Sequence, residues 1–161
     1  MIESSKGIER VRLAFSAAGV PCDVKEMPST TRTAQEAAQA IGCEVAQIAK
    51  SLVFRGQASD TAILVIASGA HRVDEAKLAL LIGENVERAD AAFVRSRSGF
   101  AIGGVPPAGH LSNMRTFLDA ALRQHSVIWA AAGTPFAVVP LTPDNLQRLT
   151  GAEWCEVRAR D

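Results

Sequence analysis

The clearest capacity for chemistry in this sequence lies in a segment rich in glycine and proline, residues 99–110. It reads Gly-Phe-Ala-Ile-Gly-Gly-Val-Pro-Pro-Ala-Gly-His, and its glycines and adjacent prolines exclude a helix interior or a central strand. Three apolar side chains distinguish it from a solvated linker: Phe100, Ile102 and Val105. Such a loop lets another molecule approach the backbone closely, and N–H groups at Gly103 and Gly104 could bind a carbonyl, a carboxylate or a phosphate. The alternative interpretation is a tight structural turn.

Lys50 and His110 are the side chains with the next strongest claim to a role. Lys50 stands where a predicted short helix, 45–49, gives way to a buried-looking strand, 51–55. A lysine at such a junction either reaches out to water or points into a cleft as a fixed cation. His110 closes the glycine loop, where a lone histidine is either a hydrogen-bonded structural residue or a base.

Other common catalytic patterns are missing from the sequence. No Ser, Cys or Thr stands in a GxSxG context, and no Ser/His/Asp set follows from spacing. The His, Cys and acidic residues do not cluster with metal-ligand spacing, and neither phosphate-loop pattern is present. We therefore expect no metal and no cofactor. A rigid backbone loop with one cation suits attack by water or by the substrate's own hydroxyl while backbone donors hold a carbonyl. It suits passive binding equally well.

Composition narrows the class of protein further. The 161 residues carry 17 basic and 17 acidic side chains, so the formal net charge is zero and any contact with nucleic acid is expected to be local. No apolar run is long enough to span a bilayer. Charged residues near the start argue against a signal peptide: Glu3, Lys6 and Glu9. Three scattered cysteines are expected to be free thiols in a reducing cytoplasm: Cys22, Cys43 and Cys155.

The elements that must position these groups follow from periodicity, caps and turns. Ser4 or Ser5 is expected to cap a first helix that ends at Gly19, and Thr33 with Glu36 forms a capping box. Further helical signals cover residues 34–41, 45–49, 74–82, 90–94 and 143–149. Strands are predicted over 22–27, 51–55, 61–67, 127–132, 136–139 and 155–157, while 116–122 fits a strand or a helical turn. This mixture of helices and hairpins predicts one α+β domain over residues 1–161 with a mixed, largely antiparallel sheet.

Several segments together resemble a known family. The strongest are Ile48–Phe54 (Ile-Ala-Lys-Ser-Leu-Val-Phe) and Gly103–His110 (Gly-Gly-Val-Pro-Pro-Ala-Gly-His), in this order and spacing. Supporting matches are Thr33–Ala38, Arg72–Asp74 with Lys77, and Trp129–Pro135. The chain resembles, over residues 28–151, the YbaK/ProX aminoacyl-tRNA editing domains, which are related to the editing insertion of bacterial prolyl-tRNA synthetase. The resemblance implies a twisted, mostly antiparallel mixed sheet surrounded by helices.

The resemblance also implies an activity, which is hydrolysis in trans of an amino acid wrongly esterified to tRNA. Lys50 matches a lysine that contacts the terminal adenosine or its phosphate, and Gly103 to Pro107 match a loop that surrounds the aminoacyl group with backbone. Lys50, Gly103 and Gly104 are thus the catalytic candidates. The substrate-binding candidates are Thr33, Val105, Pro106, Pro107, Gly109, His110, Gly133 and Thr134. Assistance by the ribose 2′-OH, or by a water that it orients, would explain the missing side-chain nucleophile.

The substrate follows less directly. Pro106 and His110 resemble a free-standing branch of the family. The family as a whole implies as substrate a small amino acid such as Ala, Cys or Ser on tRNA(Pro) or a related tRNA. The partner is then the aminoacyl-tRNA acceptor end, with a synthetase as a further possible partner and no membrane. Two other functions stay open: a non-catalytic module that binds acceptor ends or nucleotides, and a metabolite-binding domain.

Overall fold

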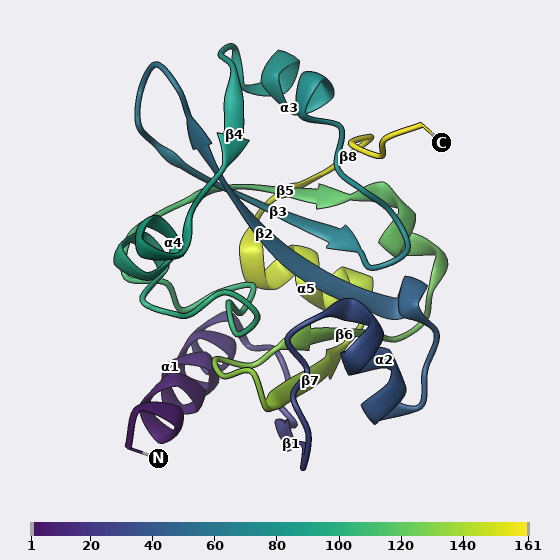
Figure 1. Ribbon diagram of the computed structural model, residues 1–161. Helices are drawn as coiled ribbons and strands as arrows, with labels where there is room; N and C mark the ends of the chain where they lie inside the picture. Colours follow the sequence, from purple (N-terminus) through teal and green to yellow (C-terminus); the bar gives the residue numbers. More distant parts are fainter. Residues whose placement is uncertain (1, 161) are drawn as a thin grey trace.

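The computed structural model describes residues 2–160, which form one twisted mixed sheet with helices around it (Figure 1). The strands follow the order β1, β7, β6, β2, β3, β5, β8, and β4 pairs with the end of β2. Their bounds are β1 Lys25–Glu26, β2 Ile48–Gly56, β3 Ala62–Ser68, β4 Val86–Arg88, β5 Arg115–Asp119, β6 Ile128–Ala131, β7 Ala137–Leu141 and β8 Glu153–Cys155. Within these residues four strand pairs are antiparallel and three are parallel. The predicted α+β domain with a mixed sheet is confirmed.

The helices begin and end at residues that satisfy their terminal backbone groups. They are α1 Ile2–Ala18, α2 Ala34–Ile41, α3 Glu75–Ile82, α4 Ala91–Ser98 and α5 Pro143–Thr150, with short 3₁₀ turns η1 Val45–Gln47 and η2 Ala120–Gln124. The hydroxyl of Thr33 accepts a hydrogen bond from the N–H of Glu36 at 3.1 Å, and the Glu36 side chain completes the predicted capping box. The side chains of Asp74 and Thr142 likewise accept hydrogen bonds from N–H groups in the first turns of α3 and α5. None of the helices within 2–160 is long and apolar enough to cross a bilayer.

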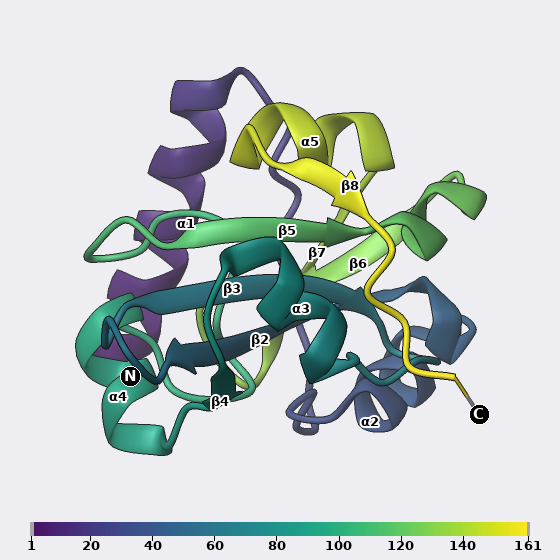
Figure 2. The same cartoon turned by 90° about the horizontal axis from the view of Figure 1, so that it is seen from above.

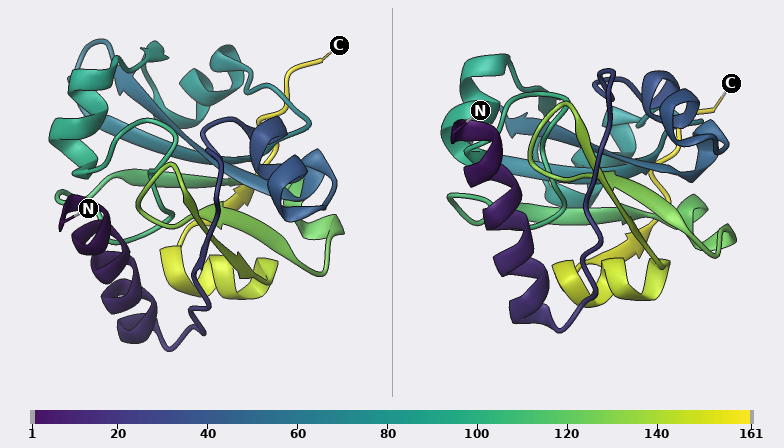
Figure 3. Two further views of the ribbon diagram at one scale, coloured as in Figure 1. Left: turned by 60° about the horizontal axis from the view of Figure 1, so that its bottom comes forward. Right: turned by 90° about the horizontal axis from the view of Figure 1, so that it is seen from below.

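Alternation along the strands gives the sheet two buried faces. Val53 and Leu64 belong to the larger hydrophobic cluster, to which α1, α4 and α5 contribute, whereas Phe54 packs with Leu78 of α3 on the other face. Figure 2 shows α3 crossing over β2 and β3, with α1 and α5 away from it. In Figure 3 the segment that follows α1 runs past β7, where β1 pairs, before it reaches α2. The sheet therefore presents one face to α3 and the other to the glycine loop.

Several predicted boundaries in the first half of the chain are wrong. The first helix starts at Ile2, so Ser4 and Ser5 lie inside it and do not cap it. The predicted strand 22–27 shrinks to β1, because only two of its residues pair with β7. The predicted helix 45–49 is the turn η1 alone, since pairing with β6 draws Ile48 and Ala49 into β2. Lys50 thus lies within a strand and not at a helix–strand junction.

The second half shows differences of the same origin. Strand β4 was not predicted, and the predicted helical turn 90–94 extends into α4 with its basic residues. The ambiguous stretch 116–122 divides into the end of β5 and the start of η2. The last strand is shifted towards the N-terminus from 155–157 to β8, where it pairs with β5. For the strands β4, β5 and β8, a distant pairing partner set the limits of the element.

Candidate active site

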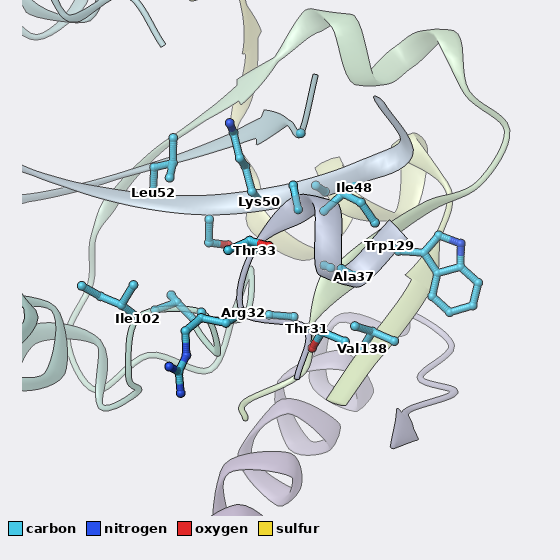
Figure 4. Close-up of a pocket in the computed structure, with 18 of the residues that line it drawn as sticks. Thr31, Arg32, Thr33, Ala37, Ile48, Lys50, Leu52, Ile102, Trp129 and Val138 are labelled. Atoms are coloured by element: carbon cyan, nitrogen blue, oxygen red, sulfur yellow. The ribbon is translucent and has the colours of Figure 1, made fainter. Parts of the chain in front are cut away.

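A cavity of about 310 Å³ opens beside β2, and most of its walls come from segments far apart in the sequence (Figure 4). These are β2 itself, the start of α2 with the residues before it, strands β4 and β6 with their neighbours, and the glycine loop. The lining side chains that carry polar groups, apart from the Trp129 indole, are Thr31, Arg32, Thr33, Gln35, Lys50, Ser51 and Arg88. No carboxylate and no histidine is among the lining residues. The cavity therefore carries positive charge among largely apolar walls, and neither a carboxylate nor a histidine is there to act as a general base.

The cavity lies at a break in the pairing of β2. The parallel ladder with β6 ends at Ala49 and Ala130, whereas on the same edge the Ala89 N–H donates to the Val53 carbonyl and β4 pairs from Phe54 onwards. Backbone groups alternate along a strand, and the Ile48 carbonyl points towards β3, where it accepts from Gly69. The N–H and C=O of Ser51 therefore face the break between β6 and β4. An unpaired strand edge of this kind is ready to bind a ligand.

Lys50 lines the cavity from the α3 side of β2. Figure 4 shows its side chain rising from the strand on the opposite side from Arg32 and Ile102, so the ammonium group points away from these two residues. The side chain has no hydrogen bond or ion pair within residues 2–160. Burial lowers the pKa of Lys50, and the positive charge of Arg88 lowers it further, while Asp119 partly opposes this. A half-buried cation that forms no ion pair within residues 2–160 is suited to an anionic ligand.

Arg32 and Arg88 extend this positive lining. Both are exposed, and together with Lys50 they place three cations around a cavity without a carboxylate, although the whole chain has no net charge. The N-terminal end of α2 at the same wall adds backbone N–H groups and the positive end of the helix dipole. This concentration of positive potential favours phosphate groups.

Within the glycine loop, Gly103 and Val105 reach the cavity, as does Ile102. Gly103 has φ +91°, and a Cβ there would lie 2.6 Å from Cγ of Arg32, so the glycine permits a close contact between the loop and the residues before α2. The N–H groups of Gly103 and Val105 have no partner among residues 2–160. Gly104 differs, because its N–H donates to the Ala101 carbonyl at 2.9 Å, so it presents no free donor.

The rest of the loop is held inside the protein and does not line the cavity. Pro106 and Pro107 are buried, and Nε2 of His110 lies 2.7 Å from the Pro106 carbonyl oxygen. Burial lowers the pKa of His110, the hydrogen bond to Pro106 opposes this, and the charge of Arg10 lowers it further. The carbonyl of Gly109 accepts a hydrogen bond from Arg10 at 3.0 Å. In this geometry these four residues shape the loop from behind.

Of the remaining predicted binding residues, one lines the cavity and two lie behind the glycine loop. Thr33 lines the cavity, with its hydroxyl engaged in the cap of α2. Gly133 and Thr134 lie behind the loop: the Gly133 N–H donates to the Gly104 carbonyl at 3.1 Å, and the Thr134 hydroxyl accepts from Phe136. They contact the loop and are not among the residues that line the cavity.

Sequence reasoning missed several residues that line the cavity, among them Arg32, Ser51 and Arg88. Arg32 stands beside the recognisable Thr33 cap, which was a usable signal. Ser51 follows Lys50 directly, yet its importance depends on the break in pairing. Arg88 sits on a strand that the sequence did not predict.

The fold and the site define a protein with a cation-lined cavity at a break in a mixed sheet. The chain belongs to the aminoacyl-tRNA editing domain family, whose model matches residues 28–149. The expected resemblance is thereby confirmed. Editing of aminoacyl-tRNA is the activity of that family.

Similar proteins cover nearly the whole chain. YwhH of Bacillus subtilis is 30% identical over 151 residues, which is 93% of this chain and 96% of the relative. EbsC of Enterococcus faecalis, a candidate deacylase of Cys-tRNA(Pro) and Cys-tRNA(Cys), is 28% identical over 130 residues, covering 80% of this chain and 79% of EbsC. The crystal structure of a candidate trans-editing enzyme for prolyl-tRNA synthetase superposes with a TM-score of 0.89 at 43% identity, over 96% of this chain and 98% of that one.

Proposed function

We propose that this protein hydrolyses, in trans, the ester bond between a small, wrongly attached amino acid and the 3′ end of tRNA(Pro) or a related tRNA. The observation that carries the proposal is the cavity with three cations, unpaired backbone donors and no carboxylate. Names of relatives point the same way, with EbsC connected to Cys-tRNA and the structural neighbour to prolyl-tRNA synthetase. Such a reaction would take place where tRNA is charged, in the cytoplasm.

The proposed roles follow from where each group lies. Three cations would hold the phosphates of the terminal nucleotides. The Lys50 ammonium would act as a point charge, and the guanidinium groups of Arg32 and Arg88 would donate paired hydrogen bonds. The N–H groups of Gly103, Val105 and Ser51 are the donors available to the ester carbonyl. A donor of this kind contributes most when the carbonyl oxygen becomes negatively charged in the transition state.

The attacking oxygen would come from water, oriented by the substrate's own ribose hydroxyl. It adds to the ester carbonyl carbon, and the tetrahedral intermediate then collapses with release of the tRNA hydroxyl and the free amino acid. Neither a histidine nor a carboxylate lines the cavity to take the proton, so the substrate hydroxyl and solvent must transfer it. An aminoacyl ester is reactive enough for positioning and carbonyl polarisation to accelerate it.

Deacylation of a panel of Ala-, Cys-, Ser-, Thr- and Pro-tRNA tests the proposal. We expect one or more small amino acids to be released faster than by buffer alone, and Lys50→Ala to lose most of the rate. Lys25→Ala is the matched control, because Lys25 is exposed on β1 outside the cavity. Binding of charged tRNA without any acceleration would instead identify a non-catalytic binding module, and unchanged turnover by Lys50→Ala would remove Lys50 from the site.

A further inference from the structure

The hydroxyl of Ser51 is a buried polar group without a partner. Within residues 2–160 its Oγ is the buried side-chain oxygen or nitrogen that makes no hydrogen bond. Leaving a buried hydroxyl unpaired is unfavourable, so such a group in a native protein calls for a reason. Ser51 also lines the cavity, where a group on a ligand can reach the hydroxyl and supply the partner.

The surroundings of this hydroxyl restrict what that group can be. Ser51 projects to the same side of β2 as Ala49 and Val53, both of which are buried in the larger cluster. Val94 and Val105 belong to the same cluster and also line the cavity. The hydroxyl is therefore surrounded by aliphatic walls on the side of the sheet from which the glycine loop packs.

A charged ligand group does not fit these walls. The α-ammonium of an amino acid would lose its water there and gain one neutral hydroxyl, in a cavity whose charged lining groups are all positive. A small neutral group that both donates and accepts a hydrogen bond matches a serine hydroxyl on both counts.

We propose that Ser51 is a specificity-determining residue, whose hydroxyl bonds to the side-chain hydroxyl of a seryl group on the tRNA. This inference rests on the proposed function, and it names the substrate class within it. An aliphatic cavity alone discriminates weakly between serine and alanine, whereas a site that hydrogen-bonds the substrate hydroxyl rejects the analogue that lacks it. A cysteinyl thiol is a weaker donor and should rank between the two.

The test compares Ser- and Ala-charged forms of the same tRNA with the wild-type protein and the variants Ser51→Ala and Ser51→Thr. We expect the ratio of kcat/KM for Ser-tRNA to that for Ala-tRNA to fall on the order of tenfold in Ser51→Ala, the value of one hydrogen bond. Ser51→Thr keeps the hydroxyl and should retain most of the preference. An unchanged ratio would overturn the inference, and so would an equal loss on both substrates.

Binding and stability measurements separate this inference from the proposed function. If the wild-type protein cleaves no charged tRNA, the proposed function fails, and affinity for non-cleavable 3′-seryl- and 3′-alanyl-amide adenosine decides about Ser51. Preference for the seryl compound that disappears in Ser51→Ala supports the inference, and equal affinities contradict it. The melting temperature of unliganded Ser51→Ala should equal or exceed that of wild type, because the variant removes an unpaired hydroxyl. A lower value would mean that the hydroxyl has a structural partner.

Discussion

Arg10 of α1 and Gly109 of the glycine loop are joined by a hydrogen bond of 3.0 Å from the guanidinium Nη2 to the carbonyl oxygen. The same guanidinium lies over the ring of Phe100, with its Cζ 4.8 Å from the ring centre. One side chain thus contacts both ends of the loop, and it comes from a helix that precedes the matched region of the family. Through Arg10, helix α1 therefore supports the glycine loop from behind the candidate active site.

Removal of these Arg10 contacts should lower the stability of the folded protein. We expect Arg10→Ala to lower the free energy of unfolding by about 1–3 kcal/mol, since it removes a charge-assisted hydrogen bond and a cation–π contact. Urea unfolding measures the change. Arg12→Ala is the control on the same helix, because Arg12 is exposed. Equal midpoints for the two variants would show that the contact to Gly109 contributes nothing.

Gly7 offers a case in which two effects oppose each other. In an exposed helix, Gly→Ala stabilises by about 1 kcal/mol through helix propensity. A Cβ on Gly7, however, would lie 2.7 Å from the carbonyl oxygen of Gly133, a backbone atom that cannot turn aside. We expect the clash to win, so Gly7→Ala should lower the thermal midpoint. A rise equal to the loss caused by Ala17→Gly, at an exposed position of α1, would contradict the close contact.

The three cations around the cavity should be visible in salt dependence. We expect Arg32→Ala and Arg88→Ala each to weaken binding of a CCA-ended oligonucleotide. Each should also reduce the slope of log Kd against log salt by about 0.7, the value for one contact with a single-stranded phosphate. Fluorescence anisotropy from 50 to 400 mM salt measures both quantities, and Lys25→Ala serves as control. A slope that does not change would place that arginine outside the path of the phosphates.

His110 should make stability depend on pH. Burial lowers its pKa below the ordinary 6.5, so near and below that value the unfolded chain binds a proton more readily than the folded one. The contribution of a neutral His110 is therefore complete above pH 6.5 and is lost as the pH falls. We expect His110→Asn to have a flatter plot of unfolding free energy between pH 7 and 5 than the wild type. A slope that stays the same, or one that His71→Asn changes equally, would assign the pH dependence to other groups.

Local signals in the sequence determined much of this protein. The Thr33 box, the Asp74 and Thr142 caps and the glycines that end helices each act on backbone groups a few residues away. The strand pair β2 and β3 was also predictable from its apolar runs. Lys50 and the glycine loop were recognisable by type and order, and Lys50 lines the cavity together with Gly103 and Val105 of the loop.

Tertiary structure decided which of these groups meet the ligand. The break at Ser51 exists because β6 and β4, distant in sequence, pair with different ends of β2, and no local pattern encodes where two ladders stop. The same holds for the glycine loop, in which the Gly104 N–H donates to the Ala101 carbonyl while the Gly103 N–H has no partner among the described residues. Arg88 belongs to β4, a strand of only three residues whose partner is the distant end of β2. Residue types depend on the chain alone, but exposure, orientation and unpaired backbone depend on contacts between segments far apart in the sequence.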